Sequence, residues 1–332
     1  MKLFVTGGAG FIGSNFVRHM LAAYPDVHIV NFDALTYAGN LENLSDIEKD
    51  ARYTFVRGDI SRVDDVRAVF SSNKFDAIVN FAAESHVDRS LHLGAEQFIH
   101  TNVLGTQILL DASREYGVKR YVQISTDEVY GSLGAEGRFS ETTPVAPNNP
   151  YSATKASADF LVRAAQHSHG VDAVITRCSN NFGPYQFPEK LIPLMIANAL
   201  EDKPLPVYGD GMHVRDWIYV LDHCSAIDAV LRKGRAGEVY NIGSMSDVPN
   251  LHVVKQILAI LKKPESLIKF VKDRPGHDRR YAMDAVKIQK ELGWKPAQSF
   301  DDGLKLTVDW YLGHKPWLDR VRSGEYAKYY EK

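Results

Sequence analysis

Cysteine is scarce in this 332-residue chain, and long apolar runs are missing. The two cysteines, Cys178 and Cys224, lie far apart and form no CxxC pattern, which argues against a disulfide framework and a structural zinc site. No apolar run approaches the roughly 18 residues of a membrane span. The N-terminal apolar run, residues 3–5, gives way at once to glycines. We therefore expect no signal peptide, no metal and a cytoplasmic location.

An excess of charge of either sign is also lacking. Lysine and arginine number 39 against 41 aspartate and glutamate residues, which gives a formal net charge of −2. This balance argues against nucleic acid or an anionic membrane as the main partner. No Ser/Gly-rich tract, internal repeat or low-complexity segment marks a linker. The length suits one large α/β domain, or two unequal domains that share an interface.

What the sequence does contain, directly after the short apolar run, is a glycine-rich turn. Gly7, Gly10 and Gly13 have the spacing G-x-x-G-x-x-G, and an amphipathic segment then runs to about residue 24. Such glycines allow a tight turn and bring backbone amides close to a pyrophosphate. A strand, a glycine turn and a helix in this order predict a dinucleotide-binding unit.

An acidic residue at the end of the next expected strand indicates which dinucleotide binds. That strand covers residues 27–32 and ends in Asp33, which lies 20 residues after Gly13. A carboxylate there accepts hydrogen bonds from the adenosine ribose hydroxyls and repels a 2′-phosphate, so NAD is favoured over NADP. The alternative is that Asp33 only caps a turn.

Strands and helices continue to alternate through the first half of the chain. A helical stretch covers about residues 94–116, and further apolar strands are expected at residues 53–56, 76–81, 121–124 and 173–176. This alternation predicts a Rossmann-type doubly wound parallel sheet, and ligands bind such sheets at the carboxyl ends of the strands. Asp59, Ala82 to Ser85 and Ser125 to Glu128 fall at those ends and are candidate site residues.

Tyr151 and Lys155 form a candidate proton-transfer pair. They are four residues apart on a segment, about residues 151–167, that reads as a helix after three prolines, so they lie on one face. A nearby ammonium group lowers the pKa of a tyrosine by favouring the phenolate. Tyr151 could then accept a hydroxyl proton while a hydride leaves for NAD.

Two adjacent carboxylates, Asp127 and Glu128, follow the strand that ends near Ile124. A simple alcohol oxidation needs neither of them. Elimination of water from a sugar needs one group that removes a proton and a second that protonates the departing hydroxyl, and two carboxylates in different environments can divide these roles. The alternative is that both carboxylates cap a helix or face solvent.

These motifs together resemble the dTDP-glucose 4,6-dehydratase family, which belongs to the extended short-chain dehydrogenases/reductases. The likeness covers nearly the whole chain, and no catalytic position departs from the family pattern. Its most specific pieces are residues 82–88 (AAESHVD), 126–131 (TDEVYG), 187–193 (FPEKLIP) and 215–217 (RDW). The resemblance implies a hydro-lyase that uses NAD to convert dTDP-glucose into a 4-keto-6-deoxy sugar nucleotide.

The resemblance also implies a role for each catalytic residue. Tyr151 would be the base for the hydroxyl at carbon 4, Lys155 would assist it, and Thr126 would position the sugar. Glu128 would remove the proton at carbon 5, and Asp127 would protonate the hydroxyl that leaves carbon 6. The cofactor contacts predicted from motifs and resemblance together are Gly7, Gly10, Phe11, Ile12, Gly13, Asp33, Ala34, Leu35, Thr36, Asp59, Ile60, Phe81, Ala82, Ala83, Ser85, Thr101, Ser125, Tyr151, Lys155 and Asn181.

The second half of the chain is expected to hold the sugar nucleotide. Residues 180–185 are polar and turn-rich, as a binding loop would be. Residues 273–281 carry three arginines and a histidine; such a run is often a solvated basic face, but guanidinium groups also suit a diphosphate. The substrate contacts that the resemblance implies are Ser85, His86, Thr126, Asn180, Lys190, Leu191, Pro206, Tyr208, Arg215, Asn250, Arg274 and His277. For His86, a packed structural role is equally open.

We therefore expect a mainly NAD-binding Rossmann domain at residues 1–176. A smaller mixed α/β domain at residues 177–332 would mainly bind the nucleotide sugar, with interwoven segments that return to the first domain. The two long helices, about 94–116 and 151–167, resemble those that form a four-helix dimer contact in relatives, which implies a homodimer.

Three other functions are compatible with parts of the pattern. A nucleotide-sugar 4-epimerase would share the glycines, Asp33, Tyr151 and Lys155, but would not need Asp127 and Glu128. A dehydratase of UDP-glucose differs only by one methyl group on the base, a contact worth about 1–3 kcal/mol. An inert dinucleotide-binding scaffold would need none of the catalytic groups. Deoxysugars of this kind feed cell-wall rhamnose, surface polysaccharide and antibiotic glycosylation alike, so the sequence does not select a pathway.

Overall fold

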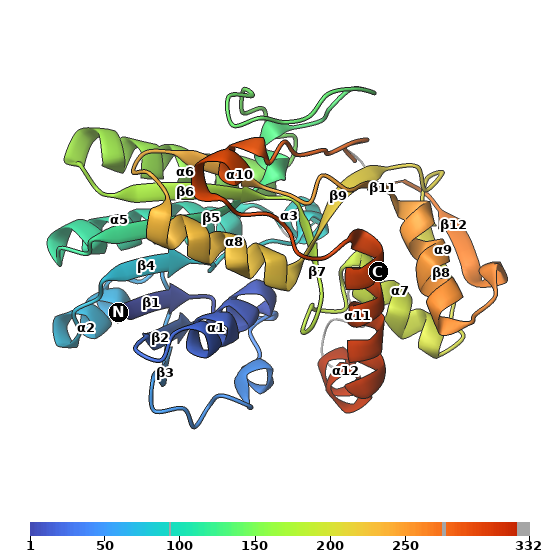
Figure 1. Ribbon diagram of the computed structural model, residues 1–332, viewed down its shortest axis with the longest axis horizontal. Helices are drawn as coiled ribbons and strands as arrows, with labels where there is room; N and C mark the ends of the chain where they lie inside the picture. Colours follow the sequence, from blue (N-terminus) through green and yellow to red (C-terminus); the bar gives the residue numbers. More distant parts are fainter. Residues whose placement is uncertain (93, 274–276, 324–332) are drawn as a thin grey trace.

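The computed structural model describes residues 1–92, 94–273 and 277–323, and a large parallel sheet lies at its centre (Figure 1). The order of this seven-stranded sheet is β10-β6-β5-β4-β1-β2-β3, and each pairing in it is parallel. Its strands are β1 (Lys2–Thr6), β2 (His28–Asp33), β3 (Tyr53–Arg57), β4 (Ala77–Asn80), β5 (Arg120–Thr126), β6 (Ala173–Cys178) and β10 (Val239–Ile242). The predicted doubly wound parallel sheet is confirmed.

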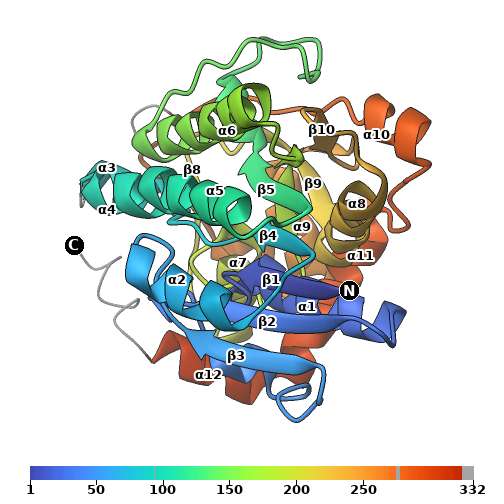
Figure 2. The ribbon, with the colours of Figure 1, turned by 90° about the vertical axis from the view of Figure 1, so that its left-hand side faces the viewer.

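Helices cover both faces of this sheet, as Figure 2 shows in end view. The layer with α2 (Val63–Ser72), α5 (Gly105–Glu115) and α6 (Pro150–His169) lies on one face, and α1 (Phe11–Ala23) and α8 (Val220–Lys233) pack together on the other. The alternating residues of β1 show why the sheet needs both layers. Leu3 and Val5 join the core under α1 and α8, whereas Phe4 joins the core under α2, α5 and α6.

A smaller region lies beside the carboxyl ends of the strands (Figure 1). It has a three-stranded sheet in the order β11-β9-β7 and a two-stranded sheet of β12 and β8. Its strands are β7 (Asn180–Phe182), β8 (Leu205–Tyr208), β9 (Val214–Tyr219), β11 (Asp247–Pro249) and β12 (Ile268–Val271). Its principal helices are α7 (Leu191–Leu200), α9 (Asn250–Leu261), α11 (Phe300–Gly313) and α12 (Lys315–Arg322). These helices share one apolar core with β7, β8 and β9.

The chain passes between the two regions more than once. After β9 it returns to the large sheet as α8, which packs against α1, and as β10, which pairs with β6. It then re-enters the smaller region at β11. The remaining helical segments are α3 (Val87–His92), α4 (Glu96–Phe98), α10 (Val286–Leu292), η1 (Leu41–Leu44), η2 (Ile99–Leu104), η3 (Asp127–Tyr130) and η4 (Glu265–Leu267).

The helical stretch expected over residues 94–116 contains a wide turn that the sequence pattern does not reveal. Here α4 is followed by η2, a π-helical segment, before α5 begins. Asn102 lies in this segment, is buried, and its amide nitrogen donates to Glu84 O at 3.0 Å and to Thr154 Oγ1 at 2.9 Å. The wide turn therefore anchors the loop after β4 to α6. Within the described ranges, no helix combines the length and apolar character needed to cross a membrane.

Candidate active site

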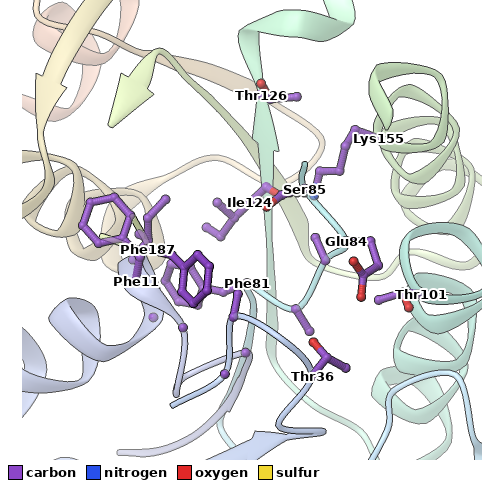
Figure 3. Close-up of a pocket in the computed structure, with 18 of the residues that line it drawn as sticks. Phe11, Thr36, Phe81, Glu84, Ser85, Thr101, Ile124, Thr126, Lys155 and Phe187 are labelled. Atoms are coloured by element: carbon purple, nitrogen blue, oxygen red, sulfur yellow. Dashed lines mark hydrogen bonds between the residues drawn. The ribbon is translucent and has the colours of Figure 1, made fainter. Parts of the chain in front are cut away.

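A cavity of about 310 Å³ lies at the carboxyl ends of the parallel strands (Figure 3). Figure 3 shows Phe11, Phe81 and Phe187 on one side of it, and Thr101 and Lys155 on the other. Every predicted cofactor contact except Leu35 lines this cavity, and so do the predicted catalytic residues Thr126 and Glu128. The strand-end rule therefore locates the cavity from sequence, while the role of each residue stays a prediction.

The glycine turn forms the wall next to α1. Gly7 has a φ of +68°, and a side chain there would bring its Cβ to 2.6 Å from the backbone nitrogen of Ala82. Gly10 is the N-cap of α1 and offers no side chain that could occupy the first amides of the helix. A helix N-terminus with free amides and a positive partial charge suits a pyrophosphate.

Asp33, the last residue of β2, caps a turn and lines the cavity, while its contact to the cofactor ribose stays a prediction. Its carboxylate accepts hydrogen bonds from the backbone amides of Ala9 at 2.9 Å and Leu35 at 2.8 Å, so it does cap the turn. It also lines the cavity. Burial raises the pKa of Asp33, and the two amide hydrogen bonds oppose that shift. The remaining acceptor positions of the carboxylate suit a ribose diol.

Several buried polar atoms along the cavity have no hydrogen-bond partner among the residues that the structure describes. They include Ser125 Oγ, Ser179 Oγ, Asn180 Oδ1 and Gln186 Oε1, and all four residues line the cavity. Buried polar groups in folded proteins are nearly always paired, so unpaired ones in a cavity wall indicate a polar ligand. The donor set and the glycine turn fit the expected NAD.

The helix α6 presents Tyr151 and Lys155 to the cavity from its first turns. Asn149 begins this helix with a capping box, in which its side chain accepts from the Ser152 amide at 2.8 Å, and Pro150 occupies the first helical position. The Lys155 ammonium donates to Ile124 O at 2.6 Å, which fixes it beside β5. Both Tyr151 and Lys155 are buried.

Burial changes the expected ionisation of this pair. It raises the pKa of Tyr151 well above its ordinary value, and the charge of Glu128 adds to the effect. Burial also lowers the pKa of Lys155. The lower tyrosine pKa expected from the neighbouring ammonium group is therefore wrong, because burial disfavours the charged phenolate.

The two adjacent carboxylates lie in a 3₁₀ turn directly after β5. Thr126 caps this turn: its hydroxyl accepts from the Glu128 amide and donates to Asp127 Oδ1, both at 3.2 Å. Glu128 is partly buried, lines the cavity, and accepts from Asn149 Nδ2 at 3.4 Å. Asp127 is 2% exposed and lies just outside the lining, and its Oδ2 atom has no hydrogen-bond partner in the described part of the chain.

Their environments separate the two acids electrostatically. Burial raises the pKa of Asp127 well above its ordinary value, and the charges of Glu128 and Asp216 raise it further, while Arg215 opposes them. These influences favour the protonated form of Asp127. The arrangement therefore places an acid that tends to keep its proton, Asp127, beside the more accessible carboxyl group of Glu128.

The predicted substrate contacts divide into two groups. Ser85, Thr126, Asn180 and Lys190 line the cavity, and the Lys190 ammonium donates to Ser85 O at 3.1 Å, directly before Leu191 begins α7. The others lie outside the lining: Pro206 and Tyr208 on β8, Arg215 on β9, Asn250 at the start of α9, Leu191, His86 and His277. Arg274 falls outside the described residues.

His86 is buried in the wall behind Ser85. Its Nδ1 atom accepts from the Arg89 amide at 3.2 Å, and its Nε2 atom lies 3.6 Å from Glu189. These contacts supply the packed structural role that the sequence left open, and a substrate contact for His86 stays a prediction.

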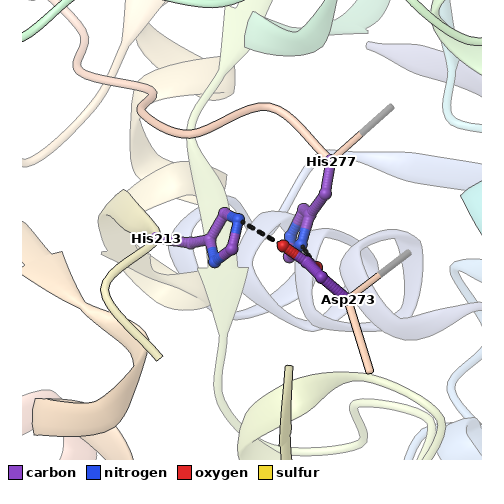
Figure 4. Close-up of side chains that lie close together, drawn as sticks. All are labelled: His213, Asp273 and His277. Atoms are coloured by element: carbon purple, nitrogen blue, oxygen red, sulfur yellow. Dashed lines mark hydrogen bonds and ion pairs between the residues drawn. The ribbon is translucent and has the colours of Figure 1, made fainter. Parts of the chain in front are cut away.

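In the basic run of residues 273–281, His277 forms a cluster with His213 and Asp273 (Figure 4). The Asp273 carboxylate lies 2.6 Å from His277 Nδ1 and 3.2 Å from His213 Nε2. The two imidazole rings stack with centroids 3.7 Å apart and an interplanar angle of 14°. A metal ion binds in the plane of an imidazole ring, and two stacked rings have separate planes. The geometry fits a hydrogen-bonded support for His277 better than a metal site.

Arg279 and Arg280 of the same run, and Arg215 on β9, make structural contacts. Arg279 binds Asp210 with two hydrogen bonds, of 2.7 and 2.8 Å. Arg280 donates to Gly137 O at 2.9 Å and lies 3.4 Å from Asp247. Arg215 donates to Asp278 O at 2.9 Å, and its guanidinium carbon lies 4.4 Å from the centre of the Tyr281 ring.

Some lining residues were missed by the sequence reasoning. Ser179 and Glu189 adjoin the predicted Asn180 and Lys190, and Gln97 lies one helical turn before Thr101 and donates to its hydroxyl at 3.3 Å. Sequence neighbourhood could have indicated these three. Gln186 carried no such signal, because it reaches the cavity through the loop between β7 and α7.

The fold and the cavity define an NAD-binding enzyme of the extended short-chain dehydrogenase/reductase class. A family model described as GDP-mannose 4,6 dehydratase matches residues 4–307. The dTDP-glucose 4,6-dehydratase of Xanthomonas campestris pv. campestris (strain B100) is 54% identical, with 97% of this chain and 96% of the relative covered. The chain therefore belongs to the dTDP-glucose 4,6-dehydratase family.

Solved structures give the same assignment. The dTDP-glucose 4,6-dehydratase DesIV of Streptomyces venezuelae, solved with NAD and TYD bound, is 50% identical, has a TM-score of 0.93, and covers 97% of this chain and 100% of its own. The UDP-glucose 4-epimerase of Thermus thermophilus, solved with NAD, has a TM-score of 0.88 but only 30% identity, with 95% and 100% covered.

Proposed function

We propose that this protein catalyses the NAD-dependent dehydration of dTDP-glucose to dTDP-4-keto-6-deoxyglucose. The observation that carries the proposal is that Glu128 lines one cavity with Tyr151 and Lys155, while Asp127, next to Glu128, lies just outside the lining and acts electrostatically on Tyr151. Oxidation of the sugar needs only Tyr151 and Lys155. Dehydration needs Asp127 and Glu128 as well, because it also removes a proton and a hydroxyl group.

In the oxidation, Tyr151 removes the proton from the hydroxyl at carbon 4. NAD, when bound, supplies a positively charged nicotinamide ring that accepts the hydride from carbon 4 and later returns it to carbon 6. Beside a positive charge, the tyrosine ionises more readily than in the protein alone. Lys155 assists Tyr151 from the next turn of α6, and Thr126 orients the sugar.

In the elimination, the new ketone makes the proton at carbon 5 acidic. Glu128, which lines the cavity, removes that proton. Asp127, protonated because burial and its neighbours raise its pKa, donates a proton to the hydroxyl that leaves carbon 6 as water. Glu128 finally returns its proton to carbon 5. Each carboxylate thus has one role, set by its surroundings.

The substrate is held between the two regions in this proposal. Residues 1–176 mainly bind NAD, and residues 177–332 mainly bind the nucleotide sugar. The Lys190 ammonium and Asn180 reach the cavity from the smaller region. The unpaired Asn250 Oδ1 atom suits the base, and the Arg215 guanidinium suits a phosphate oxygen. His277 is the further phosphate or ribose contact.

The first test is incubation of the purified protein with dTDP-glucose and catalytic NAD, followed by mass spectrometry of the sugar nucleotide. Loss of one water without net NADH supports the dehydratase. An unchanged mass with altered stereochemistry at carbon 4 would instead identify an epimerase, the second candidate that the shared fold favours. Parallel incubation with UDP-glucose measures the preference for the base.

We also propose that the protein is a homodimer that works in the cytoplasm, with rhamnose as one destination of its product. The face made by η2 and α6 supports the dimer, because Ile99, Leu104 and Phe160 are 51%, 42% and 55% exposed there. An apolar face of this kind is commonly covered by another subunit. Light scattering gives the mass, and Phe160→Glu should produce monomers if this face forms the contact.

A further inference from the structure

A buried ion pair lies directly behind Lys155. Asp159 follows Lys155 by four residues on α6, so it lies one turn further along the same face of the helix. Arg177 on β6 donates from Nε to Asp159 Oδ2 at 2.9 Å. The two residues are 2% and 5% exposed, and neither lines the cavity.

The arginine of this pair is held from the far side. Its backbone pairs with Ser125 across β5 and β6, and its guanidinium carbon lies 4.8 Å from the centre of the Tyr130 ring. Tyr130 donates to Asn241 Oδ1 at 2.7 Å. These contacts hold the Arg177 guanidinium on the far side of Asp159. The negatively charged carboxylate is therefore the member of the pair on the α6 side.

The pair is not what a purely structural role would require. The second carboxylate oxygen, Asp159 Oδ1, is buried and makes no hydrogen bond of ordinary length among the described residues, although the Ser125 hydroxyl lies near enough to the carboxyl group to lower its pKa. A buried acid with an unpaired oxygen is unfavourable, and well-packed neutral side chains commonly replace such a pair at no cost in stability. A function that needs a negative charge at this position explains its presence better.

The group that gains from this charge is Lys155. Burial lowers the pKa of Lys155, and the negative charge of Asp159 is the largest influence that opposes this. The neighbouring thiol of Cys178 stays neutral, because burial raises its pKa to about 12. On the cavity side, Glu128 and Asp127 act on Tyr151.

Burial raises the pKa of Asp159, and the charge of Arg177 opposes that shift. We propose that Asp159 is a positioning residue for the reaction, whose carboxylate, paired with Arg177, keeps Lys155 protonated beside Tyr151. This inference rests on the proposed function, since a protonated Lys155 is needed to favour the phenolate form of Tyr151. Asp159 lies outside the cavity lining, so it acts through Lys155.

The test is the dependence of kcat/KM on pH for Asp159→Asn. Without the Asp159 carboxylate, Lys155 loses its proton at lower pH, and Tyr151 is therefore harder to ionise. The rising limb of the kcat/KM profile should then move to higher pH by roughly one unit or more. Activity near neutral pH should then fall about tenfold for each unit and recover at higher pH. The KM for dTDP-glucose should stay within about twofold.

Two further variants separate this effect from a loss of stability. Asp159→Asn combined with Arg177→Gln removes both charges, so no lone charge stays buried, and this protein should fold while keeping the shifted limb. Asp228→Asn is the matched control. Asp228 is also buried and pairs with Arg232 at 2.9 Å, but it lies on α8 beside Tyr24, away from the site. Loss of the Asp228 carboxylate should lower the melting temperature without moving the rising limb of the kcat/KM profile.

A direct titration decides the question even if turnover is absent. In protein labelled with ¹³C at lysine Cε, the signal that disappears in Lys155→Met belongs to Lys155. Its titration midpoint should fall by roughly one unit or more in Asp159→Asn and in the double variant. Midpoints that stay at the wild-type value, or a rising limb that stays in place or moves to lower pH in the folded variants, would overturn the proposal. A wild-type protein that releases no water from dTDP-glucose would overturn the proposed function instead.

Discussion

The two sides of the candidate site are built in different ways. On the sheet side, the groups come from the carboxyl ends of β1, β2, β4, β5 and β6, which are neighbours in one parallel sheet. In the smaller region, Asn180, Asn181 and Lys190 line the cavity, whereas the predicted contacts on β8, β9 and α9 do not. Strand order alone brings the first group together, whereas long-range packing positions the second. We therefore expect changes on the sheet side to affect kcat and changes in the smaller region to affect KM.

The largest effect should come from Tyr151→Phe. This change removes the base for the hydroxyl at carbon 4, so kcat/KM for dTDP-glucose should fall by about 10²–10⁴-fold, while NAD still binds. The measurement is the initial rate of product formation, with calorimetry to establish NAD binding. Activity within tenfold of wild type would show that another group acts as the base.

Next in size, replacement of the two carboxylates should separate oxidation from elimination. Asp127→Asn and Glu128→Gln should each lower turnover by about 10²–10³-fold, a typical share for a proton-transfer group. Reduced nicotinamide should accumulate in a single turnover of Glu128→Gln, since carbon 4 is oxidised but the proton at carbon 5 stays. Near wild-type turnover of Asp127→Asn would exclude the acid role.

The same pair predicts a pH dependence. The pKa of Asp127 is raised, so the acid keeps its proton to higher pH than an ordinary aspartic acid and loses it as the pH rises through the raised pKa. The wild-type kcat should therefore have a falling limb at higher pH, and Asp127→Asn should lack it.

A smaller effect is expected from Asp33→Ser. The loss of a charge-assisted contact to the ribose hydroxyls should weaken NAD binding about tenfold and reduce the discrimination against NADP. Calorimetry with both dinucleotides measures this change. Asp64→Asn, at an exposed acid in the first turn of α2, is the control that should leave both affinities unchanged.

The smallest effect should come from Arg215→Gln in the other region. A lost phosphate contact should raise the KM for dTDP-glucose about tenfold and leave kcat within a few-fold, because loss of the guanidinium only favours protonated Asp127 further. Arg279→Gln is the control, since Arg279 binds Asp210 in the same region. A fall in kcat with unchanged KM would contradict the division between the two sides.

The sheet could be predicted because its signals are local. The apolar runs of β1, β4 and β6 are buried on both faces, and the alternation of strands and helices is enough to order them. The same rule located the cavity, because Asp33 and Thr126 are the last residues of their strands. The start of the helix that carries Tyr151 followed from the prolines before it.

What could not be predicted depends on contacts between distant residues. The return of α8 and β10 to the large sheet has no local signal that distinguishes them from elements of the smaller region. The direction of the Tyr151 pKa shift was wrong because spacing reveals the ammonium group but not the burial. The pairing of Asp159 with Arg177 joins a helix to a strand and is equally invisible in the sequence.

The wide turn at η2 makes the length of its helix critical. Deletion of one residue there would remove the extra residue of the π-helical turn, so ordinary α-helical hydrogen bonding would run through the segment and its side chains would change direction while α5 kept its face. Asn102 would then leave the loop that carries Glu84, and Thr101 would leave the cavity wall. Such a deletion should therefore harm the site more than an alanine at any single exposed position of the same helix. In this protein, register along a surface helix is a requirement of the active site.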